Sequence, residues 1–182
     1  SGNDDLRPVM SGIFFELSKG EVRLVATDAH KLVRYTRKDL KTEGDAGFIV
    51  PKKPLNLVKA AIPDTDQAVT INYNSNHLFI RYGTTQMSCR LIDARFPDYK
   101  VVIPTGNPYT LTVNKAAFQS ALRRVSIFSN KSTNQVALSI SGSELQLAAQ
   151  DVDFSFEGNE RMKCQYNGED LVIAFNAKFL IE

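Results

Sequence analysis

The chain has 182 residues, of which 43% are hydrophobic and 23% are charged, and its formal net charge is +2. This is the composition of an ordinary soluble globular protein, and so small a net charge does not by itself mark a nucleic-acid binder. No apolar run approaches the ~18 residues of a membrane-spanning helix, and no signal peptide is recognisable.

Taken in chain order, helix-like segments alternate with paired strands. Residues 3–10 resemble the tail of a helix, and residues 14–28 form a predicted hairpin. Residues 51–62 are predicted as a helix with an apolar face of Leu55, Val58, Ala61 and Ile62. A second hairpin is predicted over 69–82, where apolar residues alternate around a polar turn.

A second helix is predicted over 114–128, with Asn114 as its N-cap. Its inward positions are expected to be Ala117, Phe118, Ala121, Leu122 and Val125. A third hairpin is expected at 137–151, and a further helix begins at residue 176. Cys89 and Cys164 lie in strand-like runs without metal-ligand spacing, so we expect buried thiols, a reduced intracellular protein, no metal and no cofactor.

The pattern repeats with a spacing of roughly 62 residues, long enough for one supersecondary unit. "FFELSKGEVRLVATD" (14–28) is similar to "ALSISGSELQLAAQD" (137–151), and the strand–helix junctions "FIVPKK", "LTVNKAA" and "AFNAKF" correspond. The unit is a strand, a helix and three strands in hairpins. Since the first and last units are incomplete, we expect the chain to be a slice of a longer repeating protein.

We predict two domains, residues 3–106 and 107–182, around the Pro/Gly/Asn-rich segment 104–109. A solenoid is disfavoured because helix-bearing units with hairpins, no disulfide pattern and no signal peptide argue against a secreted repeat protein.

The segment "ATDAHKL" (26–32) allows two interpretations. Asp28 and His30 are two residues apart, so on a strand they would share a face and could form an acid–base pair. However, no nucleophile motif, phosphate-binding loop or metal set accompanies them. A turn that shapes a surface is therefore the favoured reading, and an enzyme, for example a hydrolase, is the alternative.

Three segments, "LVATDAHKL", "LIDARFPDYKVVIP" and "FNAKFLIE", resemble the bacterial DNA polymerase III beta subunit, the sliding clamp. The resemblance implies an α+β DNA clamp fold, with antiparallel sheets on one side and helices on the other. It also implies that residues 3–106 are most of the middle domain, without its first strand and helix. Residues 107–182 would then be the first part of a truncated third domain.

The resemblance implies a non-catalytic subunit that encircles duplex DNA and binds short linear motifs of polymerases, the clamp loader and repair factors. The positions that match the motif pocket are Arg7, Met10, Thr27, His30, Leu32, Pro97 and Val102. Two positions depart from the family pattern: Ala29 replaces the usual glycine, and Val101 replaces an arginine found in many clamps. The pocket wall formed by the family's extreme C-terminus is expected to be missing.

Two further surfaces follow from the resemblance. Cations expected to face DNA without reading its sequence are Lys52, Lys53, Lys59, Lys115, Arg123 and Arg124. Ile127 and Phe128 are expected at the subunit interface of a homodimeric ring, which this chain alone should not close. Ordinary solvation of the cations and core positions for Ile127 and Phe128 are the alternatives. The expected location is the bacterial cytoplasm, in association with the nucleoid.

Overall fold

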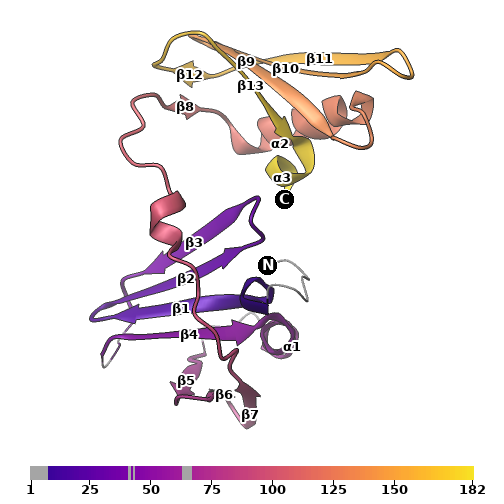
Figure 1. Ribbon diagram of the computed structural model, residues 1–182. Helices are drawn as coiled ribbons and strands as arrows, with labels where there is room; N and C mark the ends of the chain where they lie inside the picture. Colours follow the sequence, from indigo (N-terminus) through magenta and orange to yellow (C-terminus); the bar gives the residue numbers. More distant parts are fainter. Residues whose placement is uncertain (1–7, 41, 43, 63–66) are drawn as a thin grey trace. The chain divides into compact units, whose positions relative to one another are not determined.

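The computed structural model describes residues 8–40, 42, 44–62 and 67–182. The chain divides into two compact units, Ser1–Val102 and Ile103–Glu182, each drawn with its own sheets and helices in Figure 1. Within the described part of the chain, no helix has the length and apolar character needed to cross a membrane.

In its described residues, the first unit has two antiparallel sheets and one α-helix. Its elements are η1 (Pro8–Ser11), β1 (Gly12–Ser18), β2 (Glu21–Thr27), β3 (Leu32–Arg37), β4 (Ala46–Pro51), α1 (Lys52–Ala61), β5 (Thr70–Tyr73), β6 (His77–Tyr82), β7 (Thr85–Arg90) and η2 (Tyr99–Val102). One sheet has the order β3-β2-β1-β4 and the other β5-β6-β7. The isolated bridge between Ile49 and Ile92 joins β4 to the chain that follows β7.

The core of the first unit lies against one face of the four-stranded sheet. Phe15 and Val50 point to this face and pack with Leu78, Ile80 and Leu91. Because side chains alternate along a strand, Phe14 and Glu16 point to the opposite face. That opposite face carries the candidate site described below.

The second unit repeats this arrangement. Its elements are β8 (Leu111–Thr112), α2 (Lys115–Val125), η3 (Ser126–Phe128), β9 (Gln135–Ser141), β10 (Glu144–Asp151), β11 (Phe156–Lys163), β12 (Gln165–Tyr166), β13 (Leu171–Asn176) and α3 (Ala177–Ile181). The sheet order β11-β10-β9-β13 matches β3-β2-β1-β4 element by element. Leu122, Val136, Leu145 and Leu147 are fully buried between α2 and this sheet.

The repeat predicted from the sequence is therefore present in the backbone. The hairpins β1–β2 and β9–β10 both close through two-residue loops, after Ser18 paired with Glu21 and after Ser141 paired with Glu144. A glycine with positive φ lies in each loop, Gly20 at 78° and Gly142 at 54°, as tight hairpin turns require. The α+β class and the strand–helix–hairpin order are confirmed.

The helices begin close to where the sequence predicts. The Asn114 side chain accepts a hydrogen bond from the backbone N–H of Ala117, so Asn114 is the N-cap of α2. The inward prediction for Ala117 is wrong, because Ala117 is exposed. Ala61, on the predicted apolar face of α1, is exposed as well. Ala117 lies in the first turn of α2, before the helix reaches the core, and Ala61 is the last residue of α1.

Candidate functional site

The segment between β2 and β3 is a tight turn built by two side chains. The Asp28 Oδ1 atom accepts hydrogen bonds from the backbone N–H groups of His30 and Lys31, at 3.1 and 3.0 Å. The Thr27 hydroxyl accepts from the N–H of Ala29 at 3.2 Å and donates to the carbonyl of Lys31 at 2.9 Å. These bonds replace the ladder bonds that the backbone cannot make while it reverses direction.

The hydrogen bonds also set the ionisation of Asp28. Burial alone would raise the pKa of this carboxyl, but the N–H groups of Lys31 and His30 outweigh it, and the pKa lies below its ordinary value. Asp28 is therefore a carboxylate committed to the turn. A general base for catalysis needs a pKa near the working pH, so the turn geometry favours a structural role.

Ala29 occupies the left-handed region of backbone space, with a φ of 74°. The Cβ atom makes this region unfavourable for an L-residue by roughly 1–2 kcal/mol, whereas glycine enters it freely. Ala29 is also the position where the family that this sequence resembles usually has glycine. The backbone conformation at residue 29 therefore favours the residue that the family usually has there.

A second segment, residues 96–102, lies on the sheet face that carries Phe14 and Glu16. The ring of Phe96 stacks on that of Phe14, with centroids 4.8 Å apart and an interplanar angle of 7°. Three residues later, the hydroxyl of the buried Tyr99 donates to Glu16 Oε2 at 2.6 Å. Lys100 Nζ binds Glu16 Oε1 at 2.7 Å, so both oxygens of one carboxylate hold this segment.

Glu16 is therefore the centre of a charged cluster. Arg23 Nη1, from the neighbouring strand, also binds Glu16 Oε2 at 3.2 Å. Burial would raise the pKa of Glu16, but the hydrogen bonds from Lys100, Tyr99 and Arg23 and the charge of Lys100 lower it to about 2. The same cluster raises the pKa of Tyr99, through burial and the negative charge of Glu16.

The strand register places two predicted site residues on this same face. Glu16 is paired with Arg23, and Thr27 follows Arg23 by an even number of residues, so their side chains share a face. Leu32 is paired directly with Thr27. The predicted residues Thr27 and Leu32 therefore lie on the face that segment 96–102 covers in part.

The remaining predicted residues are placed as follows. His30 is exposed in the turn, Pro97 is exposed, and Val102 is exposed at 66%. Met10 is half-buried in η1. This short helix leads into β1 at the same end of the sheet as the turn between β2 and β3. Arg7 lies outside the described residues. Sequence reasoning did not find the Glu16 cluster. The signal that could have indicated it is the spacing of the two aromatic residues in "RFPDYK", Phe96 and Tyr99, which contact Phe14 and Glu16.

The predicted cations and interface residues are at the surface. Lys52, Lys53 and Lys59 are exposed on α1, and Lys115, Arg123 and Arg124 on α2. The Arg124 guanidinium pairs with Glu160 at 2.6 and 3.0 Å, which reduces its availability to another anion. Ile127 is 65% exposed and Phe128 38%, the latter lying against the Cα of Gly158.

Comparison with known proteins assigns both units. Residues 1–98 match the family described as DNA polymerase III beta subunit, central domain, and residues 100–182 match its C-terminal domain. The chain is 29% identical over 180 residues to the beta sliding clamp of Haemophilus influenzae, and 27% identical over 180 residues to that of Escherichia coli K12. Each alignment covers 99% of this chain and 49% of the relative, so the chain spans about half the length of these relatives.

Solved structures agree with this assignment. The Thermotoga maritima DNA polymerase III beta subunit has a TM-score of 0.91 at 29% identity, covering 100% of this chain and 49% of that one. A Pseudomonas aeruginosa sliding clamp bound to griselimycin has a TM-score of 0.92 at 27% identity, covering 99% and 49%. The fold is that of a DNA clamp. The chain belongs to the DNA polymerase III beta subunit family.

The Glu16 cluster predicts acid sensitivity of the first unit. A carboxyl whose pKa is depressed on folding, here from 4.5 to about 2, stabilises the fold above its unfolded pKa, and this contribution is lost as the pH falls from about 5 to 2. The shift corresponds to at most about 3 kcal/mol. Glu16→Gln should lower the unfolding free energy at pH 7 and flatten its dependence between pH 5 and 2, measured by urea denaturation followed by circular dichroism.

The matched control is Glu157→Gln, on an exposed position of β11. It should leave both the stability and its pH profile close to those of the parent. Parent-like stability and an unchanged acid limb in Glu16→Gln would contradict the assigned role of Glu16.

The φ of Ala29 gives a second prediction. Ala29→Gly should raise the unfolding free energy by up to about 1 kcal/mol, because the relief of the left-handed strain exceeds the entropy that glycine adds to the unfolded chain. Ala26→Gly, in the regular part of β2, should lower it by about 0.5–1 kcal/mol. If thermal or urea denaturation finds the two variants equally destabilised, Ala29 is not strained.

Proposed function

We propose that the chain is the central and C-terminal part of a bacterial sliding clamp, which encircles duplex DNA as a ring and confers processivity on a replicative polymerase. The observation that carries this proposal is the match of both units, in order, to the two successive clamp domains. The repeated strand–helix–hairpin unit is consistent with it, because a ring of similar units needs the same building block many times. We place its action in the cytoplasm, at the nucleoid.

The proposed role is non-catalytic. Asp28, the most plausible acid–base residue of the sequence, is engaged by two backbone N–H groups and has a lowered pKa. No group of three or more metal-binding side chains occurs among the residues that the structure describes. The enzyme alternative predicts that His30→Ala abolishes turnover of a substrate, whereas the clamp proposal predicts that it weakens peptide binding.

We propose a motif pocket on the face held by the Glu16 cluster, with Met10, Leu32, Pro97 and Val102 as its apolar part and Thr27 and His30 at its rim. The shared face of Thr27 and Leu32, and the anchoring of segment 96–102 on that face, support this arrangement. Such a pocket would take the leucine or phenylalanine anchors of a short peptide from a polymerase, clamp loader or repair protein. Arg7 stays a predicted member of it.

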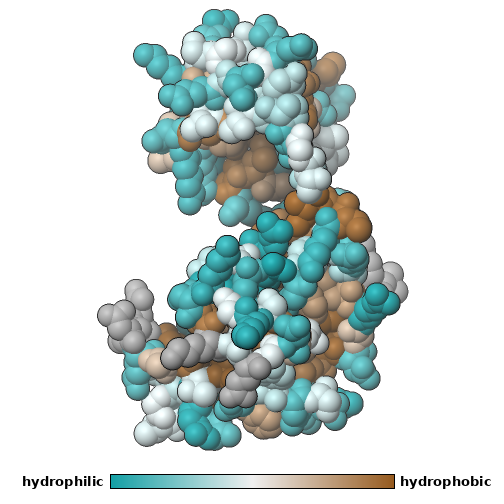
Figure 2. Space-filling view, turned by 90° about the vertical axis from the view of Figure 1, so that its left-hand side faces the viewer, coloured by the Kyte–Doolittle hydropathy of each residue, from teal (hydrophilic) through white to brown (hydrophobic). Residues whose placement is uncertain are grey.

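The exposed lysines and arginines of α1 and α2 support weak, sequence-independent contact with phosphates. Of these residues, we expect Arg124 to contribute least to phosphate contact, because it already pairs with Glu160. The exposed Ile127 and half-exposed Phe128 support the proposed subunit interface, since a second subunit would remove this apolar surface from water. In Figure 2, brown hydrophobic atoms interrupt the teal surface in both units.

The pocket proposal is tested by titrating a fluorescent peptide of the QLxLF type. Leu32→Ala should weaken binding about tenfold, the effect of losing one buried apolar anchor contact worth roughly 1–2 kcal/mol. The control is Leu57→Ala, because Leu57 is 66% exposed on α1 and outside the pocket. Equal weakening by both variants, or no saturable binding by the parent, would count against the pocket.

The DNA proposal is tested by the salt dependence of binding to a duplex. Replacing Lys52 and Lys53 by glutamate should lower affinity for all sequences alike and reduce the slope of log K against log salt by about 1–2, as phosphate contacts are lost. The control replaces Lys19 and Lys38 by glutamate, because both lysines are exposed outside the helices and their replacement changes the charge by the same amount. If the control variant reduces the salt slope by the same amount, the lysines of α1 have no special role in DNA binding.

A further inference from the structure

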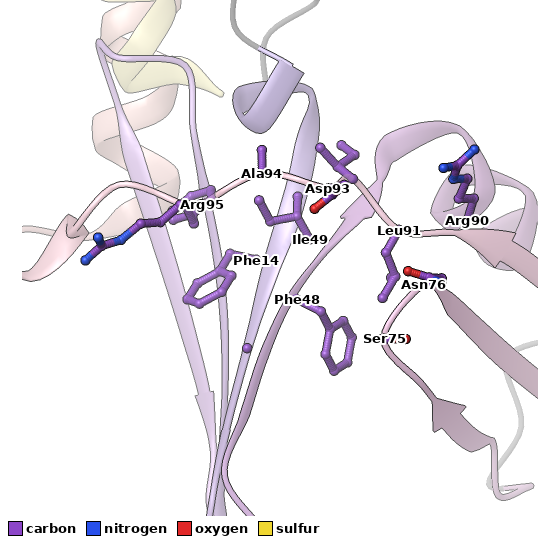
Figure 3. A pocket seen from close by; sticks show the side chains of 13 residues that line it. Phe14, Phe48, Ile49, Ser75, Asn76, Arg90, Leu91, Asp93, Ala94 and Arg95 are labelled. Atoms are coloured by element: carbon purple, nitrogen blue, oxygen red, sulfur yellow. The ribbon is translucent and has the colours of Figure 1, made fainter.

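A cavity of about 410 Å³ opens in the first unit where the four-stranded sheet meets the β5–β6 turn. This volume is within the roughly 300–1,000 Å³ typical of ligand pockets. Phe14, Phe48 and Leu91 contribute its apolar part, and Ser75 and Asn76 lie on the wall of the β5–β6 turn (Figure 3). Of the predicted motif-pocket residues that the structure describes, none lines it.

The Phe14 ring, one wall of the cavity, takes its position over a glycine whose own backbone conformation does not require glycine. Gly47 lies on the strand next to Phe14 and does not have a positive φ. A Cβ built at Gly47 would come within 3.1 Å of the Phe14 ring. The absence of a side chain at residue 47 therefore lets the Phe14 ring pack directly over the backbone of β4, and its stack on Phe96 fixes the ring there.

Two cations border the cavity. Arg90 and Arg95 are both exposed, and no ion pair of either occurs among the described residues. Figure 3 shows their guanidinium groups at opposite ends of the cavity, while Asp93 lies between them near Ile49. The border is thus positive at its two ends and negative near its middle.

We propose that this cavity binds an acidic peptide segment that carries one aromatic or large aliphatic side chain between carboxylates. The apolar side chain would enter at the edge of β4, where Phe14 lies on one face of the sheet and Phe48 on the other, and the flanking carboxylates would meet Arg90 and Arg95 in bidentate pairs. The side chains of Ser75 and Asn76 are placed to bind the peptide backbone. Asp93 disfavours a carboxylate at the centre, which is why the anchor is uncharged. The inference does not depend on the proposed clamp function.

The test is a binding isotherm with the fluorescein-labelled peptide Glu-Glu-Phe-Glu-Glu against the 182-residue chain. Saturable binding is expected, with a loss of at least about fivefold in Arg90→Glu and in Arg95→Glu. The matched control is Arg81→Glu, because Arg81 is exposed on β6 and does not line the cavity. It should change affinity by less than about twofold.

Two altered peptides separate the contributions. Replacing phenylalanine by alanine should abolish saturable binding if the cavity takes the anchor, and replacing the glutamates by lysines should do the same if the arginines are engaged. Gly47→Ala should weaken binding of the original Glu-Glu-Phe-Glu-Glu peptide, and circular dichroism should show that this variant is folded. Equal loss in Arg81→Glu, or binding that survives the alanine peptide, would show non-specific attraction and overturn the proposal. Competition by the QLxLF peptide would place the acidic peptide in the other pocket, with the same consequence.

Discussion

The first unit depends on one carboxylate for the position of its last segment. Glu16 projects from the sheet face opposite the core and is bound by Tyr99, Lys100 and Arg23, so a residue of β1 holds a segment about 84 positions later in the chain. The stacked rings of Phe14 and Phe96 fix the same segment at a second point. Two attachments, one polar and one aromatic, define its direction across the sheet. Without them, Pro97 and Val102 would have no defined place relative to Thr27 and Leu32.

The turn at 27–32 is the other half of the same surface. The side chains of Thr27 and Asp28 hold it, because they satisfy backbone groups that a reversal would otherwise leave unpaired. The same bonds that make Asp28 unsuitable as a catalytic base place His30 at the surface. A shaped, polar-rimmed face with apolar residues is what recognition of a short peptide requires, and it needs no chemistry from the protein.

Much of the fold was predictable because the spacing of apolar residues along the chain indicates its strands and helices. Alternation over 14–28 and 137–151, the cap at Asn114 and the repeated strand–helix junctions specify local elements that the backbone forms with little help from distant residues. The exposure of Ala61 and Ala117 was not predictable, because helical spacing shows which residues share a face but not where the neighbouring sheet ends. The Glu16 cluster and the cavity beside Gly47 join residues 84 and about 45 positions apart, respectively, and no local pattern encodes such contacts. The predicted pocket residues came from family resemblance, and they remain a prediction.

The most direct test of this account is whether Glu16 positions the proposed motif pocket without touching a peptide. The measurement is a double-mutant cycle on QLxLF-peptide affinity with Glu16→Gln, Tyr99→Phe and the double variant. The account predicts that each single variant weakens binding and that the double variant is little worse than either, because both remove the same anchor of segment 96–102. Parent-like affinity in both single variants, with the fold intact, would contradict it.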